Sequence, residues 1–197
     1  MQPELSLRMQ DRILEEATRL FVMRGYDGIS MREIAEACQI TKAGLYYYYR
    51  DKAQLLLAIL KAHLDEIAKI IEPCIQSNDR VEKKITDLVH GIFELPPNQR
   101  AVIRLASSEM HHLDADTRRE FGQIYHEKFI GQIQALLEAG VRNGDLDLEN
   151  SETATWILLG MMYPFFTPEQ NLEKTERDQL LAQILDIFLH GASREVS

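Results

Sequence analysis

The chain has 197 residues, of which 45% are hydrophobic and 27% are charged, and its net charge is −9 at pH 7. This is the composition of a globular protein, and two cysteines without CxxC spacing exclude a disulfide framework and a cysteine metal centre. The longest apolar stretch, 156–166, is too short to span a bilayer, and the N-terminus lacks the apolar core of a signal peptide. We therefore expect a cytoplasmic protein with no membrane partner.

The negative charge is unevenly distributed along the chain. Residues 1–52 contain eight Lys or Arg and eight Asp or Glu, whereas residues 53–197 contain 14 and 23. The first segment is therefore neutral, and the whole excess lies in the second. A neutral segment still binds nucleic acid when its cations share one face, so the net charge does not exclude DNA as a partner.

Three helices are predicted in the first 52 residues. Hydrophobic periodicity marks the first, and Gly25 ends it. Ser30 and Glu33 have the spacing of a capping box, which starts the second helix. Thr41 caps a short third helix that continues through Tyr48.

Longer amphipathic helices are predicted in the rest of the chain. A fourth helix follows residue 51, and we expect Pro73 to end it. Asn143 and Gly144 are typical of a hairpin, but their flanks do not alternate in hydrophobicity, so we expect a helix end there. The remaining predicted helices are one closed by Pro96 and Pro97, then 98–112, 114–143 (capped by Asp114), 151–163 and one from Thr175 onward. No strand is predicted, so the expected fold is all-α with about nine helices.

The second and third helices are each too short to bury a core alone. Ile34 and Leu45 would pack them against the first helix at a steep angle, as in a helix-turn-helix. Lys42 and Tyr47 would then point outward, and the small Ala43 would let the third helix approach base edges in a major groove about 12 Å wide. Side chains suited to phosphate contacts lie at the helix ends: Arg32, Arg50 and Lys52.

Four consecutive tyrosines, 46–49, allow two interpretations. They are either half-buried aromatics that stabilise a small domain or direct DNA contacts, and the residues alone favour neither. Four neighbours cannot all face inward on a helix, however, so with Tyr49 inside we expect Tyr47 and Tyr48 to be exposed. Adjacent exposed tyrosines are typical of a binding surface.

The first 60 or so residues resemble the TetR (tetracycline-repressor-like) family of transcription regulators. The resemblance is carried by Ala35, by the turn Cys38-Gln39-Ile40-Thr41, by Gly44-Leu45-Tyr46-Tyr47-Tyr48-Tyr49 and by Lys52-Ala53-Gln54-Leu55. The chain departs from the family pattern at three places. Cys38-Gln39 stands where Ala-Gly is usual, Tyr48 where His is common, and Tyr49 where Phe is common.

This resemblance implies a three-helix helix-turn-helix head over residues 1–52 and a larger helical body over 53–197 for ligand binding and dimerisation. It implies a homodimeric repressor that leaves its operator when a small effector binds in the body. A ligand-dependent activator of the same fold is the alternative. The predicted DNA-binding residues are Ser30, Arg32, Thr41, Lys42, Ala43, Gly44, Tyr46, Tyr47, Tyr48 and Lys52.

The predicted helix 151–163 is apolar around most of its circumference. Such a helix must be covered on nearly all sides, either by a second subunit or by the core of a monomer. The family resemblance favours the second subunit, with the last two helices pairing with their mates. The predicted dimer residues are Leu158, Met161, Leu181, Ile184, Leu185 and Phe188.

The body also carries the residues expected around the effector. Apolar walls with a few polar groups are typical of small-molecule sites, and no Arg/Lys cluster is expected there, so we predict a hydrophobic or aromatic effector. The predicted contacts are His63, Glu109, His111, Tyr125, Phe129, Trp156 and Met162. Glu109 equally fits the edge of a helix face, and each apolar residue alone equally fits the core.

Neither a cofactor nor catalysis is predicted. His111 and His112 are adjacent, so on a helix they point about 100° apart and cannot hold one metal ion together. The sequence has no nucleophile elbow, no phosphate-cradling glycine loop and no HExxH. A small helical enzyme or scaffold remains the competing class, and the capped helix-turn-helix that exposes Lys42 and Tyr47 argues against it.

Overall fold

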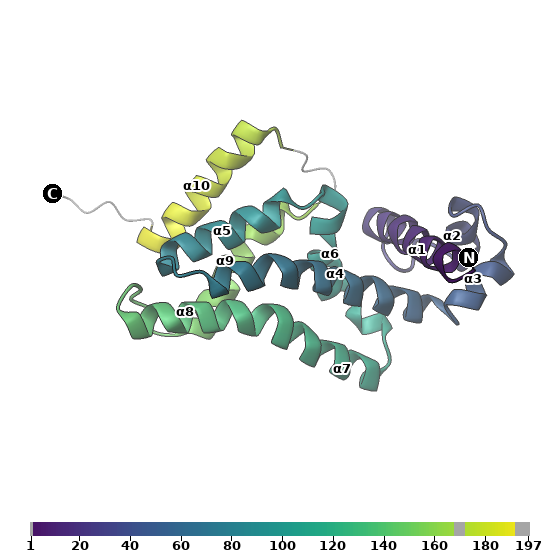
Figure 1. Cartoon of the computed structure of the whole chain (residues 1–197), viewed down its shortest axis with the longest axis horizontal. Helices are drawn as coiled ribbons and strands as arrows, with labels where there is room; N and C mark the ends of the chain where they lie inside the picture. Colours follow the sequence, from purple (N-terminus) through teal and green to yellow (C-terminus); the bar gives the residue numbers. More distant parts are fainter. Residues whose placement is uncertain (1, 168–171, 192–197) are drawn as a thin grey trace.

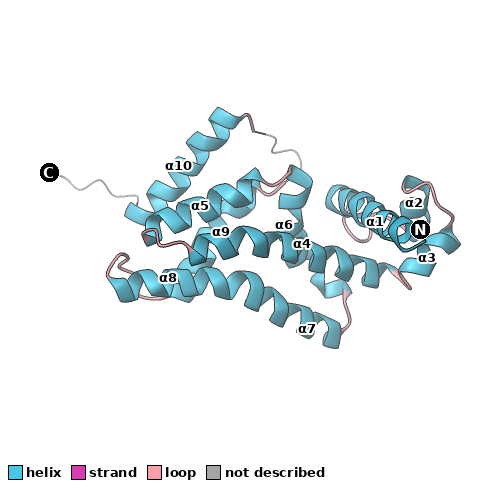
Figure 2. Ribbon diagram, in the orientation of Figure 1, coloured by secondary structure: helices cyan, strands magenta, loops and turns pink. Residues whose placement is uncertain are grey.

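The computed structural model describes residues 2–167 and 172–191, without the side chains of residues 2–6. The molecule is elongated, with the N-terminal head at one end and α10 towards the other (Figure 1). Every regular element within the described ranges is a helix, and Figure 2 shows no strand among them. The predicted all-α fold class is therefore confirmed.

The head consists of the first three helices. Gly25, with φ of 69°, ends the first helix in the left-handed conformation that glycine adopts without strain. Ile13, Phe21, Ile34 and Leu45 are fully buried and join the three helices in one small core. The helices are α1 (Gln2–Arg24), α2 (Met31–Ala37) and α3 (Lys42–Tyr48).

The body begins with α4, which runs from the head along the length of the molecule (Figure 1). A π-helical segment, η2, joins α7 to α8 without a break, so the described part has nine helices when these three count as one and the short 3-10 helices η1 and η3 are left out. The elements are α4 (Lys52–Gln76), α5 (Val81–Glu94), α6 (Pro97–Glu109), η1 (Met110–His112), α7 (Ala115–Tyr125), η2 (His126–Ile130), α8 (Gly131–Asn143), α9 (Ser151–Met162), η3 (Tyr163–Phe165) and α10 (Lys174–His190).

Three helix boundaries differ from the prediction. Pro73 does not end α4, because its missing N–H removes one bond in the last turn and the Ser77 amide still donates to its carbonyl. The predicted helix 98–112 is divided into α6, which ends at Glu109, and the 3-10 helix η1. The last helix starts at Lys174, one residue before the predicted Thr175.

The fourth helix is the packing centre of the molecule. It contacts α1 and α6 near the head, and α5, α7, η2 and α8 along the body. The side of α4 that packs against these helices buries Leu56, Leu60, Leu64, Ile67 and Ile71. Any displacement of the body helices against α4 therefore acts on the element that also carries the head.

Candidate DNA-binding interface

The second helix starts with a complete capping box. The Ser30 amide and hydroxyl donate to one Glu33 carboxylate oxygen at 2.9 and 2.7 Å, and the Glu33 amide donates to the Ser30 hydroxyl at 3.3 Å. Arg24 lies 2.9 Å from the other carboxylate oxygen. The bonds from Ser30, with help from Arg24, lower the pKa of Glu33 to about 2. This network fixes the start of α2 and ties it to the end of α1.

The turn between α2 and α3 contains the only non-glycine residue of the described chain with positive φ. Gln39 has φ of 54°, which lies in the left-handed region. The turn is closed by backbone bonds from the Gln39 amide to Glu36 and from the Ile40 amide to Ala35. The sharp turn that glycine would make without strain is therefore kept with a glutamine in its place.

The third helix presents one face to the head and one to solvent. The Thr41 hydroxyl accepts the Gly44 amide at 3.0 Å, as predicted, and Leu45 is fully buried. Tyr47 is 82% exposed and Tyr46 is 43% exposed. Side chains so exposed contribute little to the core of the head, so this face is available to a partner.

Most of the predicted DNA-binding residues lie on this exposed side of the head. Their cations are organised by neighbours: the Arg32 Nε donates to Glu36 at 2.8 Å, and the Lys42 ammonium lies 5.7 Å from the centre of the Tyr46 ring. Gly44 and Tyr48 are half-buried, so Tyr48 is less exposed than predicted. The exposed members of the set are Ser30, Arg32, Thr41, Lys42, Ala43, Tyr46 and Tyr47.

A hollow of about 350 Å³ lies between α2, α3 and the start of α4. Arg50 lines it beside Arg32 and Lys42, and its Nε donates to Asp51 at 3.2 Å. Lys52 also lines the hollow, and four cations beside a single carboxylate suit a phosphate of the DNA backbone. The sequence signal for Arg50 was its position at a helix end.

Lys52 has a different environment from the predicted one. Its ammonium donates to the Tyr26 and Ile29 carbonyls at 2.7 and 2.9 Å and lies 4.0 Å above the centre of the Tyr26 ring. The charge that was expected to meet DNA is therefore directed at the loop between α1 and α2. Sequence spacing places Lys52 beside the recognition helix but does not specify which way a long side chain turns.

The seven predicted effector contacts do not converge on one described cleft. Phe129 and Met162 are fully buried in the core, and Tyr125 is packed between Phe121 and Phe129. Two clefts contain a predicted residue: one of about 560 Å³ between α1, α4 and α6, lined by His63, and one of about 400 Å³ beside α1 and α6, lined by Glu109.

Two of the predicted effector contacts lie at the surface instead. Trp156 is 49% exposed on the outer side of α9, because the helix turns Ala154 and Leu158 inward at neighbouring positions. His111 is exposed, and its Nδ1 is 2.8 Å from the Ser108 carbonyl oxygen. Both therefore lie away from the packed core in which an internal pocket was expected.

Two buried polar groups of the body are the His63 Nε2, which has no hydrogen-bond partner among the described residues, and the Tyr125 hydroxyl, which interacts with the Tyr163 phenol. Burial lowers the pKa of His63 to about 4, so its imidazole is neutral at pH 7. Burial also raises the pKa of Tyr125 above its usual range, and the neighbouring Tyr163 phenol adds to this. Such groups are costly unless something else contacts them.

Four of the six predicted dimer residues are already covered within one chain. Leu158, Leu181, Ile184 and Leu185 are buried because α9 packs on α8 and α10 packs on α5 and α9. Met161 and Phe188 are half-buried. The exposed apolar face lies one helical step away, at Trp156, Ile157 and Ile187, with Gly160 beside them on α9.

Neither a metal site nor a transmembrane helix is found in the described part of the chain. No group of three or more His, Cys, Asp or Glu residues there is arranged to hold a metal ion. No helix over residues 2–167 or 172–191 is both long and apolar enough to cross a bilayer.

Comparison with known proteins identifies both halves of the chain. Residues 13–59 match the family described as bacterial regulatory proteins, tetR family, and residues 93–194 match the QacR-like protein, C-terminal region. The chain is 24% identical over 193 residues to the regulator QacR of Staphylococcus aureus, covering 95% of this chain and 100% of QacR. It is 25% identical over 170 residues to the probable regulator YttP of Bacillus subtilis, covering 84% of this chain and 81% of YttP.

A solved structure supports the same assignment. The crystal structure of AibR in complex with isovaleryl coenzyme A and operator DNA is 26% identical, has a TM-score of 0.76, and covers 91% of this chain and 97% of AibR. The QacR-like match alone spans more than half of the chain, from α5 into its C-terminal end. The members of this family are regulators rather than enzymes. The chain therefore belongs to the TetR family of DNA-binding transcriptional regulators.

Proposed function

We propose that this regulator is a homodimeric repressor that acts in the cytoplasm, inserts α3 into the major groove of its operator and leaves the operator when an effector binds the body. The exposed side of α3 carries this proposal. Tyr47 and Lys42 contribute nothing to the core of the head, while the turn and the caps of α2 and α3 hold them in place. Two heads of a dimer would enter successive major grooves, about 34–36 Å apart.

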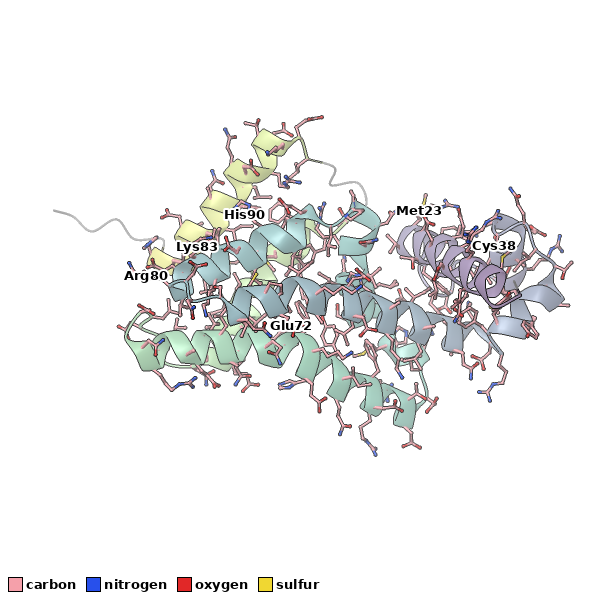
Figure 3. The ribbon with its side chains drawn as sticks, viewed as in Figure 1. Met23, Cys38, Glu72, Arg80, Lys83 and His90 are labelled. Atoms are coloured by element: carbon pink, nitrogen blue, oxygen red, sulfur yellow. The ribbon has the colours of Figure 1, made fainter. Side chains whose placement is uncertain are left out.

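Binding to the DNA upstream of the protein's own gene tests the DNA-binding face. We expect Lys42→Ala and Tyr47→Ala to weaken binding because both side chains would contact the duplex. Loss of one phosphate contact lowers the salt slope of log K by about 0.9. The matched control is Lys83→Ala, which removes another exposed cation, on α5 and far from the head (Figure 3). Wild-type affinity and slope in both head variants would contradict the assignment of α3.

The outer faces of α9 and α10 support the homodimer. Trp156, Ile157 and Ile187 are about half exposed in the single chain, and a β-carbon placed on Gly160 would meet nothing within 4 Å. The open space at Gly160 lets a second helix approach closely. We therefore propose this face, rather than the buried residues of the same helices, as the interface between two copies.

The buried polar atoms of the body support an effector site. The His63 Nε2 has no hydrogen-bond partner among the described residues, and the buried Tyr125 hydroxyl interacts with the Tyr163 phenol. Phe129 packs edge-on against Tyr125 at 5.4 Å, so an effector would reach that hydroxyl by displacing this ring, whereas His63 borders the open cleft between α1, α4 and α6. The effector that we propose is apolar, and the likeness to AibR makes an acyl group the first chemistry to test.

Thermal unfolding with isovaleryl coenzyme A, coenzyme A and isovalerate separates the parts of that ligand. A ligand that binds only the native state raises the melting temperature as its concentration exceeds Kd. We expect the two acyl compounds to stabilise the protein and to release operator DNA, and Tyr125→Phe to weaken both effects. If coenzyme A alone acts as well as its thioester, the acyl assignment is wrong while DNA binding stands.

A further inference from the structure

The head and the body meet at an aromatic residue in the loop after α1. Tyr26 is half-buried there, next to α6 and η1, and its ring lies 5.8 Å from that of Phe21 in nearly parallel orientation. Burial raises the pKa of Tyr26 above its usual range, with smaller contributions from Asp51 and Asp27. The phenol is therefore neutral and is held by contacts on both sides of its ring.

The body contacts this ring through η1, the 3-10 helix that follows α6. The His112 imidazole stacks on Tyr26 with 4.1 Å between ring centres and 18° between planes. His112 Nε2 lies 3.3 Å from a Glu109 carboxylate oxygen and 3.7 Å from one of Asp27. The His111 ring packs on the His112 ring, with 4.0 Å between the ring centres. One imidazole thus touches a carboxylate of the body and a carboxylate of the head.

The head contacts the same ring through Lys52. Its ammonium lies 4.0 Å above the Tyr26 ring centre and donates to the Tyr26 and Ile29 carbonyls. A stacked imidazole fills the space above one face, so the ammonium must occupy the other. Lys52 is the first residue of α4 and follows Asp51, whose side chain caps that helix. The ring therefore connects η1 to the residue that joins α3 to α4.

We propose that Tyr26, His112 and Lys52 form a clamp that fixes the orientation of the DNA-binding head on the body and transmits movement of the α6–η1 end to the head. The inference deepens the proposed function and rests on it for the DNA readout. These are positioning residues, because each acts on the head through the Tyr26 ring. A ligand that draws Glu109 or η1 away from the loop after α1 would remove His112 from the Tyr26 ring and release the head.

Tyr26→Leu and Tyr26→Phe separate the clamp from side-chain bulk. Leucine removes the stack and the cation–π contact, whereas phenylalanine keeps both. We expect Tyr26→Leu to weaken operator binding about 5- to 20-fold, within the usual range of allosteric coupling, and Tyr26→Phe to bind as the wild type does. The salt slope stays unchanged in both, because no phosphate contact is lost.

The head–body distance gives a readout that does not depend on DNA. Spin labels at Glu36→Cys in the head and Lys83→Cys in the body, with both native cysteines replaced by alanine, report that distance. We expect a narrow distribution in the wild-type background and with Tyr26→Phe, and a broad one with Tyr26→Leu. His112→Leu, which changes the body side of the contact at a side chain that is 17% exposed, must give the same broadening and serves as the second variant if Tyr26→Leu fails to fold.

A narrow distance distribution and wild-type operator affinity in folded Tyr26→Leu and His112→Leu would overturn the clamp. Failure of the wild-type protein to bind any upstream DNA would instead contradict the proposed repressor. In that event the distance measurement still decides whether Tyr26 holds the head. Weakened binding with an altered salt slope would also reject the clamp, since it would place these residues in the DNA contact itself.

Discussion

Gln39 keeps the helix-turn-helix in shape at a measurable conformational cost. Its φ of 54° lies in the region where a β-carbon crowds the following carbonyl. Glycine removes that crowding but makes the unfolded chain more flexible, so the two effects partly cancel. We expect Gln39→Gly to raise the free energy of unfolding by about 0.5 to 1 kcal/mol. Chemical denaturation at pH 7 measures this directly.

Two controls test the reason for that gain. Gln39→Ala keeps the β-carbon, so it should leave stability close to the wild type or lower. Gly25→Ala puts a β-carbon at φ of 69° and should be destabilising. If Gln39→Gly is less stable than Gln39→Ala, the left-handed conformation is not what limits the turn.

His63 predicts a dependence of stability on pH. Its pKa is lowered from 6.5 to about 4 by burial in the body, so the unfolded chain binds the proton more readily than the native one. Between these two values the unfolded state therefore gains protons first, and the free energy of unfolding falls as the pH is lowered. A shift of this size corresponds to roughly 3 kcal/mol, fully lost below about pH 4.

Replacing His63 with Phe isolates this contribution. The variant has no titrating group there and no buried Nε2 without a partner, so its stability should decline less between pH 6.5 and pH 4. Denaturant unfolding at pH 7, 6, 5 and 4 gives the free energy of unfolding of each protein. The difference between the two free energies cancels the titration of all other groups. A constant difference across this range would show that His63 does not carry the effect.

At the scale of single residues, the sequence predicts local hydrogen bonds better than it predicts the direction of a long side chain. The capping box of Ser30 and Glu33 and the Thr41 cap were predictable because each involves atoms only three residues apart. Lys52 was not, because its bonds to Tyr26 and Ile29 cross more than 20 positions of sequence. Tyr26 and His112 carried no local signal for the same reason.

Some cations on the helices of the head are already paired with carboxylates. Arg32 on α2 bonds to Glu36 one turn later, with both side chains mostly exposed. DNA binding at Arg32 must compete with this carboxylate. We expect Glu36→Gln to raise operator affinity about two- to fivefold at low salt, since an exposed pair is worth at most about 1 kcal/mol. The gain should shrink as salt screens the charge.

A carboxylate elsewhere provides the comparison for Glu36. Glu72, far along α4 from the head, accepts a bond from Gln76, and Figure 3 shows its position. Glu72→Gln changes the net charge equally but should leave operator affinity unchanged at the same salt. Equal gains in the two variants would attribute the effect to net charge rather than to release of Arg32.

Helix ends were predictable where capping chemistry is local and were not where packing decides. Gly144, with φ of 77°, ends α8 as expected from its type. Pro73 failed as a stop signal because it lies in the last turn of α4, where one missing bond is tolerated. The π-helical segment 126–130 has no sequence signature of its own, since Phe129 and Ile130 fit an α-helical stripe equally well.

Across the whole molecule, the layout of head and body followed from periodicity, whereas the predicted interface did not. Leu158 and Ile157 are neighbours in the sequence and equally apolar. Only the packing of α9 on α8 shows that the first is buried and the second is 52% exposed. The structure therefore shows the cover of α9 within the chain, at Leu158, and leaves the Ile157 side exposed for the second subunit that we propose.

The dimer prediction concerns Ile157, which is exposed, rather than its buried neighbour Leu158. Ile157→Glu would place an unpaired carboxylate in the proposed interface, so we expect a folded monomer by sedimentation at a concentration where the wild type is dimeric. Leu158→Glu would bury the charge inside the protomer and should unfold it. Trp156, the single tryptophan of the chain, lies on the same face, so its emission should move to longer wavelength when the dimer separates.

Leu7→Glu supplies the matched control, because Leu7 is a 61% exposed hydrophobic residue on α1, in the head. It should remain dimeric with unchanged tryptophan emission. Because an operator with two half-sites binds a dimer far more tightly than a single head, Ile157→Glu should also lose operator affinity by a factor of 100 or more, on the order expected for linked binding. A folded, dimeric Ile157→Glu with wild-type emission would place the interface on another face of the body.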